Sequence, residues 1–278
     1  MWQGHAHLEG GGEDLKDVPD VLFEEARRKL SRASKVVAVT AGKGGVGKSF
    51  VSICLALALA EKGKKVGLLD LDIHGSSIPL ALNLAREVRA GKEGFEPVKK
   101  YGIEIMSIGL LTGDAPVLIK GGDKMDLITT LVALTNWRVL DFLIIDLPPG
   151  TGDEVIWTIR VIKDLGSAGA LVVTTPSLLA HSVVRRNLEL LSNEKINILG
   201  LVENMSYFIC GKEKVWPFGP GSGDVLAREF DTRLLIQLPI EPNVEKAISE
   251  GFPPHHASKE LKNAFSILAE TIEDLMKG

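Results

Sequence analysis

Cysteine, aromatic residues and long apolar stretches are all scarce in this chain of 278 residues. Its two cysteines, Cys54 and Cys210, are too few for a disulfide framework, and Cys54 falls in a predicted helix that favours a small buried hydrophobe. No stretch approaches the roughly 18 uninterrupted apolar residues of a membrane helix, and the start lacks the basic and apolar segments of a signal peptide. These absences predict a cytoplasmic protein without a membrane partner.

An excess of basic charge is also missing. The formal net charge of −4 and the pI near 5.9 argue against a surface for general nucleic-acid binding. Hydrophobic residues make up 45% of the chain, enough for the core of one large domain. Residues 1–17 are polar and glycine-rich, so they are predicted to form a flexible tail before a single domain over residues 18–278.

Strand-like and helix-like stretches alternate along that domain. A short helix is predicted near residues 19–33, and several of the strands after it are continuously apolar, as a parallel sheet covered on both faces requires. We therefore expect a doubly wound α/β fold with a mostly parallel sheet, whose ligands bind at the carboxyl ends of the strands. The strands are predicted at residues 35–40, 65–70, 103–108, 141–146, 169–174, 198–202 and 234–238.

A glycine-rich loop lies between the first of these strands and a helical run that begins near Ser49. It fits the phosphate-loop pattern Gly-x-x-x-x-Gly-Lys-Ser/Thr in the required strand, loop and helix context. Backbone N–H groups of such a loop surround an anion, and the helix N-terminus adds partial positive charge. We expect Lys48 to contact the β- and γ-phosphates of ATP and Ser49 to bind Mg²⁺. The predicted nucleotide-binding loop comprises Gly42, Lys43, Gly44, Gly45, Val46, Gly47, Lys48 and Ser49.

The same loop also satisfies the dinucleotide pattern Gly-x-Gly-x-x-Gly, with Asp70 at the end of a later strand. Lys48 and Ser49 discriminate between the two interpretations. A pyrophosphate in a Rossmann turn needs neither an ammonium group nor a metal-binding hydroxyl, whereas a triphosphate with Mg²⁺ uses both. The triphosphate interpretation is favoured.

Another apolar strand ends in Asp146, the arrangement that holds a magnesium-bound water beneath the γ-phosphate in P-loop NTPases. The loop after it combines φ-restricted prolines with permissive glycines. This composition suits a segment that changes position with the γ-phosphate, although a plain turn has the same composition. The predicted switch comprises Pro148, Pro149, Gly150, Thr151, Gly152 and Asp153.

Two more carboxylates, Asp70 and Asp72, follow a third apolar strand. If the strand continues through both, their side chains point the same way. Hydrolysis needs a group that orients water in line with the γ-phosphate, and we expect Asp72 to do so while Asp70 supports magnesium-bound waters. Two acids in a solvated loop are the alternative. The predicted magnesium site, partly through water, comprises Ser49, Asp70, Asp72 and Asp146.

Lys43 is not needed for the general phosphate-loop pattern. The form Lys-Gly-Gly-Val-Gly-Lys-Ser resembles the deviant Walker A motif of the MinD/ParA-like ATPases. This resemblance implies a homodimer in which Lys43 reaches across the interface to the partner's nucleotide and contributes to catalysis.

Four further segments narrow the resemblance to the Mrp/ApbC-type iron–sulfur cluster carrier ATPases, in register from about residue 35 to residue 242. The resemblance implies an ATPase that is slow without a partner and that serves an iron–sulfur client protein. It also implies that Asn204, at a predicted strand end, and the loop around Pro239 hold the adenine, whose edge an Asn amide can match. The segments are residues 70–77, 145–153, 173–176 and 202–208.

The chain departs from that family at its cluster site. Members carry Cys-x-x-Cys after the Asn-Met-Ser segment, and two subunits together hold one 4Fe–4S cluster with four thiolates. Here Glu213 replaces the second cysteine, so a symmetric dimer offers two thiolates. Cys210 is open to three interpretations: a relic, a partial ligand of a cluster bridged between subunits, or a buried thiol.

The alternative function is a cluster-free, MinD/ParA-like switch that positions or adapts other molecules. A membrane-binding version needs a basic amphipathic C-terminal helix. This chain ends instead with an apolar stripe flanked by acidic residues, which predicts a helix packed on the core. A DNA-positioning version needs a concentrated basic surface, which the few neighbouring arginines and lysines around Arg185 do not supply.

Overall fold

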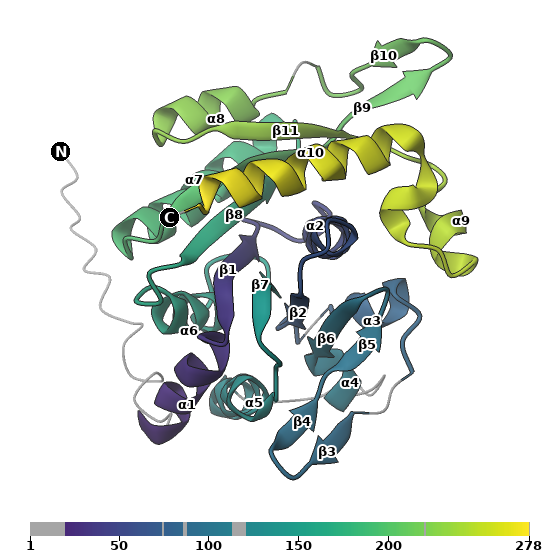
Figure 1. The fold of residues 1–278 in the computed structure, drawn as a ribbon. Helices are drawn as coiled ribbons and strands as arrows, with labels where there is room; N and C mark the ends of the chain where they lie inside the picture. Colours follow the sequence, from purple (N-terminus) through teal and green to yellow (C-terminus); the bar gives the residue numbers. More distant parts are fainter. Residues whose placement is uncertain (1–19, 74, 86–87, 113–120, 220, 278) are drawn as a thin grey trace, which may run out of the picture.

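The computed structural model describes residues 20–277 except for 74, 86–87, 113–120 and 220, so the predicted tail lies outside the described residues. Strands and helices alternate along the chain (Figure 1). The helices are α1 (Asp20–Leu30), α2 (Lys48–Glu61), α3 (Ile78–Ala81), α4 (Ile108–Thr112), α5 (Gly121–Leu134), α6 (Asp153–Ile162), α7 (Leu178–Asn193), α8 (Gly223–Glu229), α9 (Val244–Ser249), the 3-10 helix η2 (Pro254–Ala257) and α10 (Lys259–Leu275).

The main sheet has nine strands in the order β10-β9-β8-β1-β7-β2-β6-β5, with β11 also paired to β9, and β3 and β4 form a separate two-stranded antiparallel sheet. Neighbouring strands of the main sheet are parallel except for β5 and β10, which pair antiparallel with β6 and β9. The expected doubly wound fold is confirmed, and all seven predicted strands are present. The strands are β1 (Ala33–Thr40), β2 (Val66–Asp70), β3 (Arg89–Gly91), β4 (Gly94–Glu96), β5 (Val98–Lys100), β6 (Ile103–Ser107), β7 (Leu140–Asp146), β8 (Ala168–Thr174), β9 (Ile198–Cys210), β10 (Glu213–Val215) and β11 (Leu234–Pro239).

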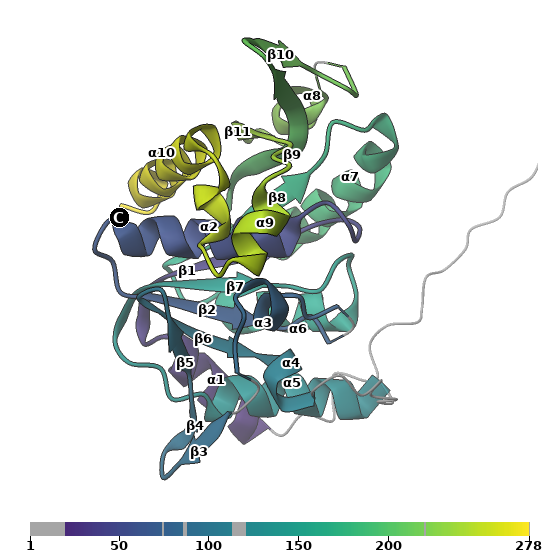
Figure 2. The ribbon, with the colours of Figure 1, turned by 90° about the vertical axis from the view of Figure 1, so that its right-hand side faces the viewer.

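The central strand β1 is buried on both faces, which explains its continuous apolar sequence. Val36 and Ala38 belong to the core that includes residues of α1, α5, α6 and α7. Val37 and Val39 alternate with them and belong to the core that includes residues of α2 and α10. Figure 2 shows α2 and α10 lying together over the sheet. The prediction for the C-terminal helix is confirmed, since Leu261, Ala264, Phe265, Leu268 and Ile272 are buried in this second core.

Several boundaries differ from the predictions by one to three residues, as where the first helix ends at Leu30, and two differences affect predicted site residues. Strand β9 runs well past the expected residue 202 to Cys210, because a hairpin with β10 prolongs it. Asn204 therefore lies inside a strand rather than at its end. Pro239 was expected in a loop but ends β11, where it pairs with Tyr207 of β9. None of the helices in the described ranges is long and apolar enough to span a bilayer.

Candidate functional site

A cavity of about 640 Å³ lies beyond the carboxyl ends of β1, β2 and β7. The carboxyl ends of neighbouring parallel strands meet at one edge of a sheet, so loops far apart in the sequence converge there. The cavity brings together the glycine-rich loop, Asp72 and the prolines of the predicted switch. Its lining residues are Lys43, Gly44, Gly45, Gly47, Lys48, Ser49, Phe50, Asp72, Gly75, Ser77, Pro148, Pro149 and Glu154.

The glycine-rich loop has the backbone shape that its sequence suggests. Gly45 and Gly47 have φ angles of 77° and 83°, in the left-handed region that glycine tolerates best, and α2 begins directly after Gly47. A Cβ atom on Gly42 would lie 2.5 Å from the carbonyl oxygen of Val183. Glycine at these positions therefore lets the loop take this shape and pack closely against α7.

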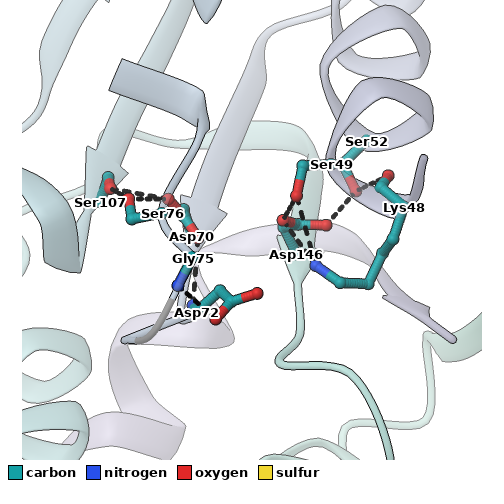
Figure 3. A network of polar contacts seen from close by, with 9 residues as sticks. All are labelled: Lys48, Ser49, Ser52, Asp70, Asp72, Gly75, Ser76, Ser107 and Asp146. Carbon is teal, nitrogen blue, oxygen red and sulfur yellow. Dashed lines mark hydrogen bonds and ion pairs between the residues drawn. The ribbon is translucent and has the colours of Figure 1, made fainter. Parts of the chain in front are cut away.

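Asp146 forms an ion pair and hydrogen bonds with three side chains at the start of α2 (Figure 3). Its carboxylate is fully buried and lies 2.8 Å from the Lys48 ammonium nitrogen. It also accepts hydrogen bonds of 2.6 Å from the hydroxyls of Ser49 and Ser52. A buried charge with one cation and two hydroxyl donors is well compensated, so these side chains hold one another in place.

Asp70 forms a second, separate group. The hydroxyls of Ser76 and Ser107 donate to one of its oxygens at 2.6 and 2.7 Å, and the Asp72 N–H donates to the other at 3.1 Å. Complete burial and the nearby Asp146 carboxylate raise the pKa of Asp70 to about 7, against the opposing effect of these hydrogen bonds. Both oxygens of Asp70 therefore already accept hydrogen bonds from protein donors.

Asp72 lines the cavity, but it lies in a turn and not in the continuing strand that was expected. Strand β2 ends at Asp70, so the alternation of a continuing strand does not apply to Asp72. The side chain lies in the following turn, where its Oδ1 accepts a 3.0 Å hydrogen bond from the Gly75 N–H. It is 8% exposed and lines the cavity opposite the glycine-rich loop, so the interpretation of two acids in a solvated loop is wrong.

The predicted switch begins beside the glycine-rich loop. The Gly150 N–H donates to the Ala41 carbonyl at 2.8 Å. The Asn187 side-chain amide donates to the Gly150 carbonyl at 3.2 Å and to the Thr40 hydroxyl at 3.1 Å. Asp153 begins α6, and the next residue, Glu154, lines the cavity. These contacts tie α7, the switch and the end of β1 together.

Asn204 and Pro239, the two residues expected to hold the adenine, do not line this cavity. Asn204 is buried, and its amide donates to the Val46 carbonyl at 2.9 Å, so it supports the glycine-rich loop from behind. Pro239 is buried at the end of β11. Contact of either residue with adenine stays a prediction.

The two cysteines occupy opposite environments. Cys54 is buried in α2, as expected, and burial raises the pKa of its thiol well above the usual range. Cys210 is exposed, so its interpretation as a buried thiol is wrong. It ends β9 and pairs with Glu213 across the β9–β10 hairpin, beside the exposed apolar residues Ile209 and Val215.

Four polar residues of the site were not predicted: Ser52, Ser76, Ser107 and Asn187. Ser52 had a readable signal, because it lies three residues after Ser49 and therefore on the same face of α2. Ser107 had none, since its position opposite Asp70 depends on β6 lying next to β2.

Comparisons with known proteins agree with this geometry. The family model described as "ParA: NUBPL iron-transfer P-loop NTPase" matches residues 32–275. The chain is 38% identical to an iron–sulfur cluster carrier protein of Aquifex aeolicus over 261 residues, covering 91% of this chain and 71% of the relative. It is 39% identical to the cytosolic Fe–S cluster assembly factor NUBP2 of Bos taurus, covering 87% and 95%. A nucleotide-binding protein from Archaeoglobus fulgidus, solved in complex with ADP, is similar with a TM-score of 0.73 and 35% identity, covering 87% of this chain and 96% of that one.

Proposed function

Since the chain belongs to the ParA family, as an iron-transfer P-loop NTPase of the NUBPL type, we propose that it is a Mg²⁺-dependent ATPase that acts in iron–sulfur cluster assembly and transfer. The observation that carries the proposal is the cavity that the glycine-rich loop, with Lys48 and Ser49, lines together with Asp72. We further propose a cytosolic protein whose residues 18–278 form one ATPase domain and whose partner is an iron–sulfur client protein.

The oxygen-rich donor set suits Mg²⁺, which prefers hard oxygen ligands. The Ser49 hydroxyl and the Asp146 carboxylate lie 2.6 Å apart, and Asp72 lines the same cavity. Ser49 would hold the ion directly, and Asp146 and Asp72 would hold it through water. When bound, Mg²⁺ supplies positive charge to the phosphate oxygens.

The protein groups then have distinct tasks in hydrolysis. The N–H groups of the glycine-rich loop and the Lys48 ammonium bind the phosphates, which orients the γ-phosphate toward the open side of the cavity. Asp72 accepts a hydrogen bond from the attacking water and orients it in line with the bond that breaks, so that ADP and phosphate are released. The switch loop, hydrogen-bonded to Ala41, transmits the presence of the γ-phosphate to α7 through Asn187.

Lys43 leads to a prediction about assembly. It lines the cavity from a position that the phosphate-loop pattern does not require, and we propose that it contacts the nucleotide of a partner subunit. Lys43→Ala should weaken ATP-dependent dimerisation about 10-fold, because a charge-assisted contact across the interface is lost. Sedimentation velocity with a non-hydrolysable ATP analogue measures this. The control Lys277→Ala removes an exposed lysine after α10 and should dimerise normally; a native protein that stays monomeric with the analogue would contradict the proposal.

The cluster would be cargo rather than a resident group. One exposed Cys210 per subunit supplies two thiolates in a dimer, fewer than the four that a 4Fe–4S cluster takes. We propose that Cys210 residues of two subunits bind a cluster weakly near the dimer axis. The open iron positions would let a client's ligands displace the protein readily, which favours transfer over storage.

Restoring the second thiol tests this site. Glu213 pairs with Cys210 across the hairpin, and paired Cα atoms in antiparallel strands lie only about 5 Å apart, so Glu213→Cys should raise reconstituted cluster content toward one per dimer. Lys214→Cys adds the same thiol on the opposite face of β10 and should not. Iron and sulfide counts after anaerobic reconstitution measure the outcome. A full cluster in the native chain that survives Cys210→Ser would show that the ligands lie elsewhere.

The function itself is tested by transfer. Anaerobically reconstituted protein is incubated with an apo iron–sulfur acceptor, with and without Mg-ATP, and the acceptor's visible spectrum is followed. Faster transfer with ATP supports the proposal. Nucleotide-dependent dimerisation without any cluster binding would instead favour the MinD/ParA-like adaptor. That function is a second candidate because the chain has only Cys210 of the family's pair of cluster-binding cysteines.

A further inference from the structure

A group of three metal-ligating side chains lies away from the nucleotide cavity. Glu61 is the last residue of α2, and His255 and His256 lie in the 3-10 helix η2 that precedes α10. The Nε2 atoms of His255 and His256 lie 3.1 and 2.5 Å from the same oxygen of Glu61. All three ligand atoms lie within 4.8 Å of one another. Helix α2 begins at the phosphate loop, so about 20 Å of helix separates this group from the nucleotide site.

His255 is positioned unlike a surface histidine. Its side chain is 1% exposed, and its Nδ1 atom is buried without a hydrogen-bond partner. Its ring lies edge-on to that of His256, with the ring centres 4.4 Å apart. Burial lowers the pKa of His255 to about 4, against the pull of the Glu61 carboxylate. Imidazole nitrogens are the commonest protein ligands of transition-metal ions.

We propose that Glu61, His255 and His256 form a binding site for a divalent transition-metal ion of the Zn²⁺ type. Two imidazole nitrogens and one carboxylate oxygen are a donor set that Zn²⁺ and Co²⁺ accept, and a fourth, solvent-facing position would be filled by water. Among the described residues, Glu61, His255 and His256 are the one group of three or more histidines, cysteines or acids whose ligand atoms lie close enough together to share a metal ion.

A tetrahedral zinc site sets the separations that these ligand atoms would take. Ligands about 2.0 to 2.1 Å from Zn²⁺ lie about 3.3 Å from each other. The His255 nitrogen already lies 3.1 Å from the Glu61 oxygen, and the His256 nitrogen would retreat from that oxygen by less than about 1 Å. His256 and Glu61 are 32% and 39% exposed and can make this movement. The Lys262 ammonium, 3.8 Å from the other oxygen of Glu61 and half exposed, would have to turn toward solvent.

The ion would join the end of α2 to the segment before α10. Both helices belong to one core, so the site would fasten the helix that begins at the phosphate loop to the C-terminal helix. A ligand that binds the folded state alone stabilises it in proportion to the logarithm of its concentration. The proposal does not depend on ATP hydrolysis or on cluster binding.

The test uses the full chain in a Cys210→Ser background, which removes the exposed thiol as a competing ligand. The protein is stripped with a chelator and titrated with Co²⁺ in saturating Mg²⁺, which occupies the nucleotide site. The ligand-field spectrum reports tetrahedral binding, and displacement by Zn²⁺ gives the affinity. We expect one ion per chain and a rise in melting temperature with Zn²⁺.

His256→Gln and Glu61→Gln should each weaken binding by about 100-fold or more, because each removes one of three ligands from a partly exposed position where the fold tolerates change. His255→Gln should do the same, and the two exposed variants decide the result if this buried one fails to fold. The matched control is His5→Gln with His7→Gln, which removes two histidines from the N-terminal segment. Absence of binding to the native chain, equal binding to all variants, or loss in the control alone would overturn the proposal.

Discussion

Lys48→Ala is expected to bind Mg-ATP about 100-fold more weakly than the native chain, a loss of about 3 kcal/mol typical of a charged hydrogen bond to a polyanion. Lys48 is the buried ammonium at the start of α2, 6% exposed and 2.8 Å from Asp146. The other lysine of the described site, Lys43, is not expected to replace it, because Lys43 lies five residues earlier in the loop and is less buried. Titration of a fluorescent ATP analogue measures the affinity.

The same substitution also affects the fold, and the two effects must be separated. Removal of Lys48 leaves the buried Asp146 with only the hydroxyls of Ser49 and Ser52, which costs several kcal/mol of stability. Melting temperatures without nucleotide identify that loss, and binding is compared at a temperature where both proteins are folded. Lys62→Ala removes a half-buried lysine just after the other end of α2, paired with Glu270, and should bind ATP normally. Equal affinities for the native protein and Lys48→Ala would end the phosphate-loop interpretation.

Asp72→Asn should bind ATP within about threefold of the native affinity yet hydrolyse it 10²- to 10³-fold more slowly, in the range that general acid–base groups contribute (about 10² or more). The amide oxygen can still accept the Gly75 N–H, so the turn after β2 keeps its shape. It lacks the negative charge that orients the attacking water. Single-turnover measurement of phosphate release separates hydrolysis from product release.

The matched control for this variant is Glu154→Gln, which neutralises another acid in the lining of the same cavity. It should retain most of the turnover because Glu154 lies on α6, on the switch side of the cavity. If Asp72→Asn kept full turnover, the water-orienting role would pass to another carboxylate, and Asp153 is the next to test.

The fold was predictable from the sequence because its central strands are apolar on both faces. The continuously apolar residues 36–39 and 142–145 predict buried strands without any knowledge of which strands lie beside them. They lie in β1 and β7. The short antiparallel strands were not predicted. Three residues such as Glu213–Val215 carry no periodic pattern, and only the pairing partner makes them a strand.

The part of the site formed by one continuous motif was predictable from the sequence. The parts that depend on contacts between neighbouring strands of the sheet were less predictable. The loop from Gly42 to Ser49 supplies six of the residues that line the cavity, as its spacing suggests. The environment of Asp70 depends on Ser107 from the adjacent β6, a contact that no local pattern encodes. Asn204 supports the phosphate loop through Val46, whereas the family resemblance implied only adenine.

The edges of the sheet restrict how copies of this chain can associate. One edge ends in the three-residue β5, which carries Lys99 and Lys100, and the other ends in β10 and in β11 with its terminal proline, Pro239. Short, lysine-bearing or proline-ended strands are poor templates for pairing with another sheet, which would otherwise lead to near-irreversible aggregates. For the dimer that we propose, this leaves the loops at the carboxyl ends of the strands, where the nucleotide would bind. A dimer built there would form and dissociate in every catalytic cycle.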